Sequence, residues 1–251
     1  TNGNIHLCGD EEEVKEIIAE CGVSWHNLDE AKKLITECYH ARADAVKFQL
    51  YDKTAIKNSR FVKHLEVTRL TESMAKELVN HAKRTDIEIF FTPMYLDAVD
   101  ICESLGVERY KVRAKDAYWS ELLMKIRLTD KPCYVSRANY KFHDPLKQKG
   151  FYTVYYDMHR PTKYLDVFRG YSNLLKSDGY SWHCTKMYVP MQVMLFGGVD
   201  YIEVHVALDA NYKTLPDWKY SHSPVDLLEL CRFKKMLNPQ LFYSRAKYEM
   251  S

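Results

Sequence analysis

The sequence lacks any long hydrophobic run. No stretch approaches the roughly 18 consecutive apolar residues that a membrane-spanning helix needs, so the sequence predicts no membrane contact. The opening residues, TNGNIHLCGDEEEVKE, do not show the basic segment and apolar segment of a secretory signal peptide. We therefore expect a cytoplasmic protein.

The sequence also lacks an excess of one charge and any closely spaced pair of cysteines. Lysine and arginine number 36 against 34 acidic residues, so the chain has no overall basic character that would favour nucleic acid as a partner. Its seven cysteines are scattered and form no Cys-x-x-Cys pair, which argues against a disulfide framework and a zinc ribbon. Reduced thiols in the cytoplasm are the simplest interpretation.

Several common catalytic motifs are missing as well. The sequence has no GxGxxG after a strand, no GxxxxGK(S/T), no HExxH and no GxSxG. These absences argue against a nicotinamide enzyme, a P-loop enzyme, a zinc protease of that type and a serine hydrolase.

The chain does have a regular alternation of short apolar runs and amphipathic stretches. Its 251 residues are 46% hydrophobic and 28% charged, as in an ordinary globular enzyme. Leu28, Ala31, Ile35 and Cys38 share one face of a predicted helix, and Met74, Leu78 and Ala82 share another. The runs predicted as strands are AVKFQ (45–49), EIFFTP (88–93), RYKVR (109–113), PCYVS (132–136), YTVYY (152–156), GYSWH (179–183) and YIEVHV (201–206).

An eighth strand near the start would complete a barrel. The segment EEEVKEIIAECGV reads locally as a helix because it is rich in glutamate and lysine. If IIAECGV (17–23) is instead a strand, the total reaches eight, the number that closes a (β/α)₈ TIM barrel. We therefore predict one TIM-barrel domain over residues 1–251.

Polar residues follow the predicted strands at their carboxyl ends, where TIM barrels place their active sites. A single lysine or histidine at such a position is usually solvated or part of the core. Convergence of several strand ends on one mouth favours a functional site instead. The residues concerned are Glu20, Lys47, Gln49, Thr92, Lys111, Arg113, Lys115, Asp116, Ser136, Arg137, Ser181, His183, Glu203 and His205.

Two of these residues suggest a metal site. Neutral imidazoles from neighbouring strands, His183 and His205, can hold a divalent cation with positions left open for water or substrate. Glu20 and Asp217 are candidates for a general base or for positioning the metal.

A second group suggests an anion site. Lys47 and Lys111, helped by Arg113 or Lys115, would form a cationic floor for a phosphate or carboxylate. A cation, an anion clamp and acid–base groups together indicate chemistry on a small phosphorylated substrate.

The same segments resemble the sialic acid synthase family, whose members join phosphoenolpyruvate to a sugar aldehyde. The resemblance covers about residues 17–230 and does not include the family's C-terminal antifreeze-like domain. It is carried by AECGVSWHNLDEAKKLITECYHARADAVKFQ (19–49), FFTPMYLDAVDICESLG (90–106), RYKVRAKD (109–116), KPCYVS (131–136), GYSWHC (179–184), GGVDYIEVHVALD (197–209) and DWKYSHSP (217–224).

The resemblance implies a TIM barrel that condenses phosphoenolpyruvate with an open-chain hexosamine-type aldose and releases phosphate. It implies a divalent ion, most often Mn²⁺ with Mg²⁺ or Co²⁺ as alternatives, on His183 and His205. It implies catalytic or sugar-contacting roles for Glu20, Asp217 and Asp116. The residues expected to bind phosphoenolpyruvate or another anion are Lys47, Gln49, Lys111, Arg113, Lys115, Ser136 and Ser181.

The segment 113–116 departs from the family pattern, in which Gly-Ser-Gly-Glu is expected. Here it is Arg113, Ala114, Lys115 and Asp116, which removes a hydroxyl and adds two positive charges. We therefore consider both an ordinary N-acetylmannosamine-like acceptor and a phosphorylated or otherwise altered sugar. The expected partners are these small molecules, with a homodimer or a separate chain supplying the missing domain as further possibilities.

Two other functions remain open at this point. One is a pyruvate or enolate aldolase or lyase on the same barrel, with Lys47 or Lys111 as a Schiff-base lysine. The other is a non-catalytic sugar- or anion-binding protein.

Overall fold

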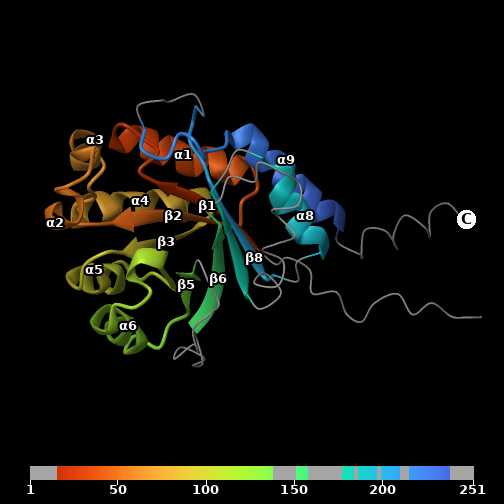
Figure 1. Ribbon diagram of the computed structural model, residues 1–251. Helices are drawn as coiled ribbons and strands as arrows, with labels where there is room; N and C mark the ends of the chain where they lie inside the picture. Colours follow the sequence, from red (N-terminus) through yellow and green to blue (C-terminus); the bar gives the residue numbers. More distant parts are fainter. Residues whose placement is uncertain are drawn as a thin grey trace, which may run out of the picture.

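The computed structural model describes residues 16–137, 151–157, 177–183, 186–196, 199–209 and 215–237. Its eight strands form one closed barrel in which each strand pairs in parallel with the next and the last pairs with the first (Figure 1). The strands are β1 (Glu16–Gly22), β2 (Ala45–Leu50), β3 (Glu88–Pro93), β4 (Tyr110–Val112), β5 (Cys133–Arg137), β6 (Phe151–Asp157), β7 (Gly179–Trp182) and β8 (Tyr201–His205). The predicted TIM barrel is confirmed.

Strand β1 is the element whose local sequence favoured another structure. It pairs with β2 on one side and with β8 on the other, with Glu20 opposite both Lys47 and His205. Its residues after Glu16 are buried, so burial on both faces and two ladders of hydrogen bonds override the helix propensity of the segment.

Within the described residues, helices follow β1, β2, β3, β4, β7 and β8 and pack on the outside of the barrel (Figure 1). Helix α1 begins after Asn27, whose side chain accepts a hydrogen bond from the Glu30 amide, and α4 begins after Thr71, which caps it in the same way. The helices are α1 (Leu28–His40), α2 (Lys53–Ile56), α3 (Val62–Val67), α4 (Glu72–Thr85), α5 (Asp97–Leu105), α6 (Ser120–Arg127), α8 (Tyr188–Phe196) and α9 (Pro224–Leu237), with a 3₁₀ turn at Ala114–Asp116.

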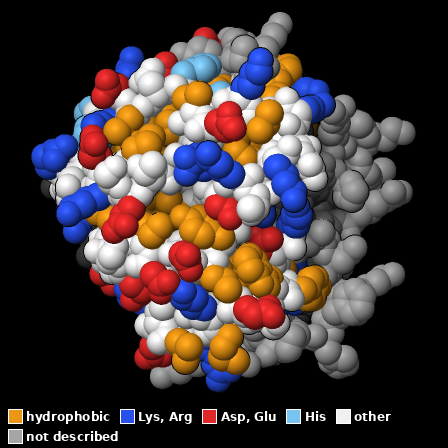
Figure 2. All heavy atoms as spheres, turned by 90° about the vertical axis from the view of Figure 1, so that its left-hand side faces the viewer, with side chains coloured by type: hydrophobic (Ala, Val, Ile, Leu, Met, Phe, Trp, Pro, Cys, Tyr) orange, Lys and Arg blue, Asp and Glu red, His pale blue; other side chains and the backbone are white. Residues whose placement is uncertain are grey.

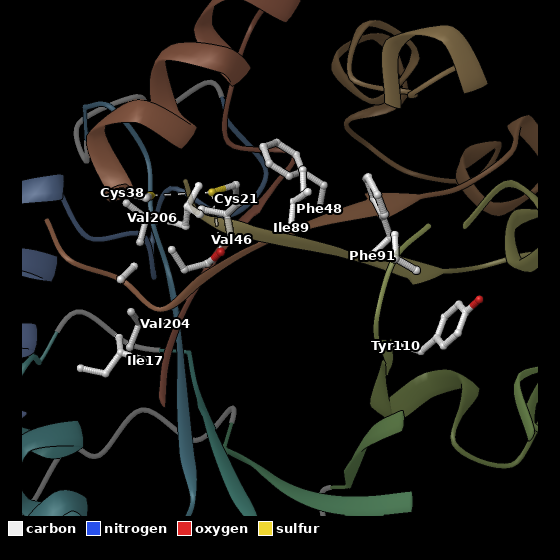
Figure 3. Packing of buried hydrophobic residues seen from close by; sticks show 14 of the residues in the cluster. Ile17, Cys21, Cys38, Val46, Phe48, Ile89, Phe91, Tyr110, Val204 and Val206 are labelled. Carbon is white, nitrogen blue, oxygen red and sulfur yellow. Dashed lines mark hydrogen bonds between the residues drawn. The ribbon is translucent and has the colours of Figure 1, made fainter. Parts of the chain in front are cut away.

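The main core lies between the strands and the surrounding helices. Figure 3 shows Val46 and Phe48 of β2 beside Cys21 of β1 and Ile89 of β3, all directed away from the barrel axis toward the helices. The remaining residues of each strand point into the barrel, because successive side chains alternate between its two faces.

Inside the barrel, an apolar layer separates two polar regions. Ile18, Ala45, Phe90 and Tyr201 form this layer, and the half-buried Tyr134 packs against it. Beneath it, toward the amino ends of the strands, Arg109 forms ion pairs with Glu16 and Glu88 and stacks over the ring of Phe90. The barrel is therefore closed below, and side chains that follow the apolar layer face the opposite end.

The state of the cysteines and the distribution of surface charge match what the composition predicts. The five cysteines within the described ranges are free and buried, and the sulfurs of Cys21 and Cys38 lie 3.9 Å apart (Figure 3). Figure 2 shows acidic and basic side chains interspersed with small apolar patches on the face that carries α2 to α6. In the portion of the chain that the structure describes, no helix has the length and hydropathy needed to cross a membrane.

Candidate active site

A cavity of about 420 Å³ opens at the carboxyl ends of the strands. Eleven of the twelve residues predicted for the site line it, and they come from six strands and the loops that follow. They are Glu20, Lys47, Gln49, Lys111, Arg113, Lys115, Ser136, Ser181, His183, His205 and Asp217. The convergence expected from the strand ends is therefore present in the fold.

Strand periodicity places the deep members of this group. On β2, Ala45 belongs to the apolar layer inside the barrel, so Lys47 and Gln49 follow it on the same face. At the end of β1 the register shifts between Glu20 and Gly22, and Gly22 has a positive φ of 25°. A β-carbon at Gly22 would lie 2.3 Å from Glu20 Oε1, so glycine is required for Glu20 to remain in this position.

Two lysines and two glutamates form an ion cluster at the base of the cavity. Lys47 pairs with Glu20, and its Nζ lies 3.6 Å from Glu203 Oε2. Lys111 Nζ donates to the same Glu203 oxygen at 2.6 Å, and Ser181 donates to the other at 2.7 Å. All four charged side chains are at most 5% exposed, so their interactions are screened little by solvent.

The outer hydrogen bonds of this ion cluster reach a second residue of β2 and one more strand, β3. Gln49 Nε2 donates to Glu20 Oε1 at 3.0 Å, and Lys47 Nζ donates to Thr92 Oγ1 at 3.1 Å. Glu20 and Lys47 are thereby held in place from β1, β2 and β3 together.

Burial and pairing change the pKa values within the cluster. Burial alone would raise the pKa of Glu203, but the positive charges of Lys111 and Lys47 lower the pKa of this carboxyl well below its usual range. Burial raises the pKa of Glu20, with Lys47 opposing the shift. Burial lowers the pKa of Lys111, whereas Glu20 and Glu203 raise that of Lys47 in spite of its burial. Glu203 is therefore the fixed anion of the cluster, and Glu20 is its more readily protonated carboxyl.

The two predicted metal ligands lie next to each other above the cluster. The rings of His183 and His205 have centroids 4.6 Å apart, and the ring of Tyr220 lies about 6 Å from both. Asp217 Oδ2 lies 3.7 Å from His205 Nδ1. Burial lowers the pKa of His205 to about 3 and that of His183 well below its usual value, while it raises the pKa of Asp217 to about 7.

These residues fit a divalent metal ion. Both imidazoles are neutral at physiological pH, as a metal ligand must be, and His205 Nδ1 is buried without a hydrogen-bond partner. Within the described ranges, no three histidine, cysteine, aspartate or glutamate side chains gather closely enough to enclose a metal. The donor set is thus an open one of two imidazoles, with positions left for water or substrate.

The loop after β4 brings positive charge to the rim. Arg113 pairs with Asp116, which is buried and is the one predicted site residue outside the cavity lining. Lys115 is exposed at the rim, and Ser136 of β5 lies nearby in the same lining. The predicted sugar-contacting role of Asp116 stays a prediction, because its carboxylate is directed to Arg113.

Sequence reasoning missed two features of the cavity. Glu203 was noted at a strand end without a role, although it joins both lysines and Ser181. An apolar wall formed by Val23, Ile56, Leu65 and Met94 was not anticipated. These four residues come from loops and short helices after β1, β2 and β3, so no single periodic pattern in the sequence connects them.

Comparison with known proteins supports the resemblance to the sialic acid synthase family that the sequence motifs suggest. A family model described as the NeuB family matches residues 34–144. An uncharacterized protein of Methanocaldococcus jannaschii is 31% identical over 240 residues, covering 88% of this chain and 68% of that protein. The N,N'-diacetyllegionaminic acid synthase of Campylobacter jejuni is 27% identical over 249 residues, covering 86% and 74%.

Solved structures share the fold. The crystal structure of N-acetylneuraminic acid (sialic acid) synthetase from Leptospira borgpetersenii matches with a TM-score of 0.75 at 22% identity, covering 95% of this chain and 89% of that one. Spore coat polysaccharide biosynthesis protein SpsE of Bacillus subtilis matches with the same TM-score at 18% identity, covering 92% and 70%. With the sequence matches, the barrel and the residues at its mouth, this chain belongs to the NeuB family.

Proposed function

We propose that this protein condenses phosphoenolpyruvate with the open-chain form of an aldose, giving a sialic-acid-like 2-keto sugar acid and phosphate. One observation carries the proposal: the buried lysine–glutamate cluster and the neutral His183–His205 pair border the same cavity. An anion site beside a metal site suits a phosphorylated donor and an aldehyde acceptor. Membership in the NeuB family supports this reaction class.

Lys47 and Lys111 would bind the phosphate and carboxylate groups of the donor. Both ammonium groups are paired with carboxylates, Lys47 with Glu20 and Lys111 with Glu203. A bound anion would compete with these two carboxylates for the ammonium groups of Lys47 and Lys111. Ser136, also in the lining, supplies a hydroxyl to the same end of the cavity.

His183 and His205 would hold the divalent ion, with Asp217 beside them. We propose Mn²⁺, with Mg²⁺ or Co²⁺ as substitutes. When bound, the ion would supply a Lewis acid that polarises the aldehyde oxygen or lowers the pKa of a water molecule.

The reaction has a simple balance of atoms. A bond forms between carbon 3 of phosphoenolpyruvate and the aldehyde carbon, and the aldehyde oxygen gains a proton. A water oxygen adds at carbon 2, and inorganic phosphate leaves, so a keto group remains there. Asp217 and Glu20 both line the cavity. In this proposal Asp217 would exchange a proton at the aldehyde oxygen, and Glu20 would accept one from water.

The test is a phosphate-release assay with phosphoenolpyruvate, Mn²⁺ and a panel of aldoses and aldose phosphates. We expect release only when all three components are present, and we expect His183→Ala and His205→Ala each to abolish it. The matched control is His40→Ala, because His40 is exposed at the end of α1. Full activity in both cavity variants would overturn the metal assignment, and absence of release with every aldose would overturn the function.

A lysine-dependent aldolase is the second candidate. The observation that favours it is Lys111, which borders the cavity and whose pKa is lowered by burial. Borohydride treatment with pyruvate would then reduce the imine and leave a stable 1-carboxyethyl group on the Lys111 nitrogen, detectable by mass spectrometry of its peptide. Unmodified Lys111 would exclude this candidate.

A further inference from the structure

The segment between β2 and α4 brings exposed positive charge to the mouth of the cavity. Helices α2 and α3 follow β2 and lie beside its carboxyl end (Figure 1). Ile56, Ser59 and Leu65 of this segment border the cavity. The exposed basic side chains that lie among them in the sequence, which we call the basic collar, are Lys53, Lys57, Arg60 and Lys63.

The charges of the basic collar are not cancelled by ion pairs. In the ranges that the structure describes, none of the four side chains forms an ion pair, whereas Lys32 of α1 pairs with Glu77 of α4 at 2.6 Å. The guanidinium of Arg60 lies 4.7 Å from the centre of the Phe61 ring, a contact that leaves its charge uncompensated. A single charge acts over a longer range than an ion pair, whose two fields largely cancel.

The acidic residues near the collar are too few to reverse its sign. Residues 52–69 hold five basic residues and two acidic ones, Asp52 and Glu66. The carboxylate of Asp52 caps α2 and accepts hydrogen bonds from the Thr54 hydroxyl and the Ala55 amide. The segment therefore has a net positive charge.

The loop after β4 adds to this charge from another side of the mouth. Lys115 is exposed, borders the cavity and forms no ion pair among the described residues, whereas Arg113 is paired with Asp116. The glutamates of the ion cluster are paired with lysines at the base, so Asp217 is the remaining acidic residue of the described lining. An anion that approaches the mouth thus meets mainly positive charge.

We propose that the basic collar attracts the anionic donor to the mouth of the cavity through long-range electrostatics, without contacting the bound donor. The proposal rests on the proposed function, in which the donor is phosphoenolpyruvate. Its carboxylate and phosphate together carry about three negative charges at neutral pH. Ile56 and Leu65 belong to the apolar wall, and a lining of low dielectric concentrates the field of nearby charges in a cleft.

The collar has a different role from the buried lysines. Lys47 and Lys111 are at most 5% exposed, so solvent ions screen their interactions with a bound anion only slightly. The collar is exposed, and its effect depends on the Debye length, which is about 30 Å at 10 mM salt and about 8 Å at 150 mM salt. Attraction by the collar should therefore fade as salt is added, whereas a direct contact with the donor would persist.

The test removes three collar charges together, as Lys57→Gln, Arg60→Gln and Lys63→Gln. Calorimetry would measure the affinity for phosphoenolpyruvate at ionic strengths from 10 to 300 mM. We expect the triple variant to bind about 10-fold more weakly than the unaltered protein at 10 mM and about twofold more weakly at 150 mM, with the two proteins converging at 300 mM. Inorganic phosphate, which carries about two negative charges, should show a smaller difference.

A second triple variant serves as the matched control. Lys76→Gln, Lys83→Gln and Arg84→Gln remove the same three charges from α4, where all three side chains are exposed and do not border the cavity. Its affinity for phosphoenolpyruvate should stay within about twofold of the unaltered protein at every ionic strength, because the removed charges are not at the mouth.

The outcomes separate the two proposals. Phosphate release together with a donor affinity that the collar variant leaves unchanged, or lowers equally at all salt concentrations, overturns the collar and leaves the function standing. A salt-dependent loss of donor affinity without phosphate release from any aldose mixture supports the collar and overturns the function. If the triple variant fails to fold, Lys63→Gln alone should weaken donor binding about twofold at 10 mM and not at 300 mM, and an unchanged affinity overturns the collar.

Discussion

Replacing Glu203 by glutamine tests the ion cluster most sharply. The carboxylate receives Lys111 at 2.6 Å and Ser181 at 2.7 Å, and Lys47 lies 3.6 Å away. Glutamine keeps the shape and one acceptor oxygen but removes the negative charge. Two buried ammonium groups would then share Glu20 as the counter-ion of the cluster.

The size of the effect follows from burial. Removing one partner of a buried ion pair costs about 3–5 kcal/mol, because the remaining charge is left without compensation. Since glutamine retains some hydrogen bonding, we expect Glu203→Gln to lower the free energy of unfolding by about 3 kcal/mol. For a chain of this size, that loss corresponds to a fall in Tm of roughly 6–12 °C.

The assay is thermal and urea unfolding with and without inorganic phosphate. Phosphate should stabilise Glu203→Gln more than the unaltered protein, because the anion can replace the missing carboxylate beside the two lysines. Glu229→Gln serves as the control, since Glu229 is exposed on α9 and should change stability by less than about 0.5 kcal/mol. A loss below about 1 kcal/mol for Glu203→Gln, with no added effect of phosphate, would refute the reasoning.

Three further predictions follow from single contacts. Burial raises the pKa of Tyr51 to about 12. The neutral hydroxyl therefore contributes stability that is complete below its ordinary pKa of 10 and is lost as the pH rises toward 12. Because phenylalanine does not titrate, urea unfolding at pH 9 to 12 should show an alkaline loss of stability that is about 2–3 kcal/mol smaller for Tyr51→Phe than for the unaltered protein. Gly179→Ala should lower stability by about 1–3 kcal/mol in thermal unfolding, since the new β-carbon would lie 2.3 Å from the Tyr201 ring. Gly22→Ala should displace Glu20 and raise the KM for phosphoenolpyruvate at least tenfold in the phosphate-release assay, because its β-carbon would meet the Glu20 carboxylate.

The two stability predictions, for Tyr51→Phe and Gly179→Ala, each have a contrary result. Parallel stability curves for Tyr51→Phe and the unaltered protein between pH 10 and 12 would show that the hydroxyl does not titrate with unfolding. An unchanged melting temperature for Gly179→Ala would mean that the Tyr201 ring moves aside freely. Gly106→Asn is the control for the glycine variants, because nothing lies within 4 Å of a β-carbon there and asparagine tolerates its positive φ of 68°.

The barrel could be predicted because most of its strands can be recognised from their own apolar residues, without reference to the other strands. Runs such as EIFFTP have a continuous apolar centre, as is typical of strands buried on both faces, and β3 begins and ends at the predicted residues. Strand β1 could not be assigned from its own residues, since glutamate and lysine around it favour a helix. Only the need for a partner between β2 and β8 identifies it, and that is a property of the whole sheet.

Site residues could be predicted from the sequence where the position of a residue at the end of its own strand is enough to place it in the cavity. Lys47, Lys111, His183 and His205 lie where parallel strands must deliver them, and all four line the cavity. Pairings across the barrel were not predictable, because which lysine meets Glu203 depends on the closure of the barrel and not on spacing along the chain. The apolar wall was missed for the same reason.

The most direct test of the proposed reaction follows carbon from donor to product. The protein would be incubated with phosphoenolpyruvate labelled with ¹³C at all three carbons, Mn²⁺ and an aldose that supports phosphate release, and the products would be analysed by mass spectrometry. We predict a 2-keto sugar acid that carries all three labelled carbons, formed in amounts equal to the phosphate released. Labelled pyruvate and phosphate without a joined product would contradict the proposed condensation.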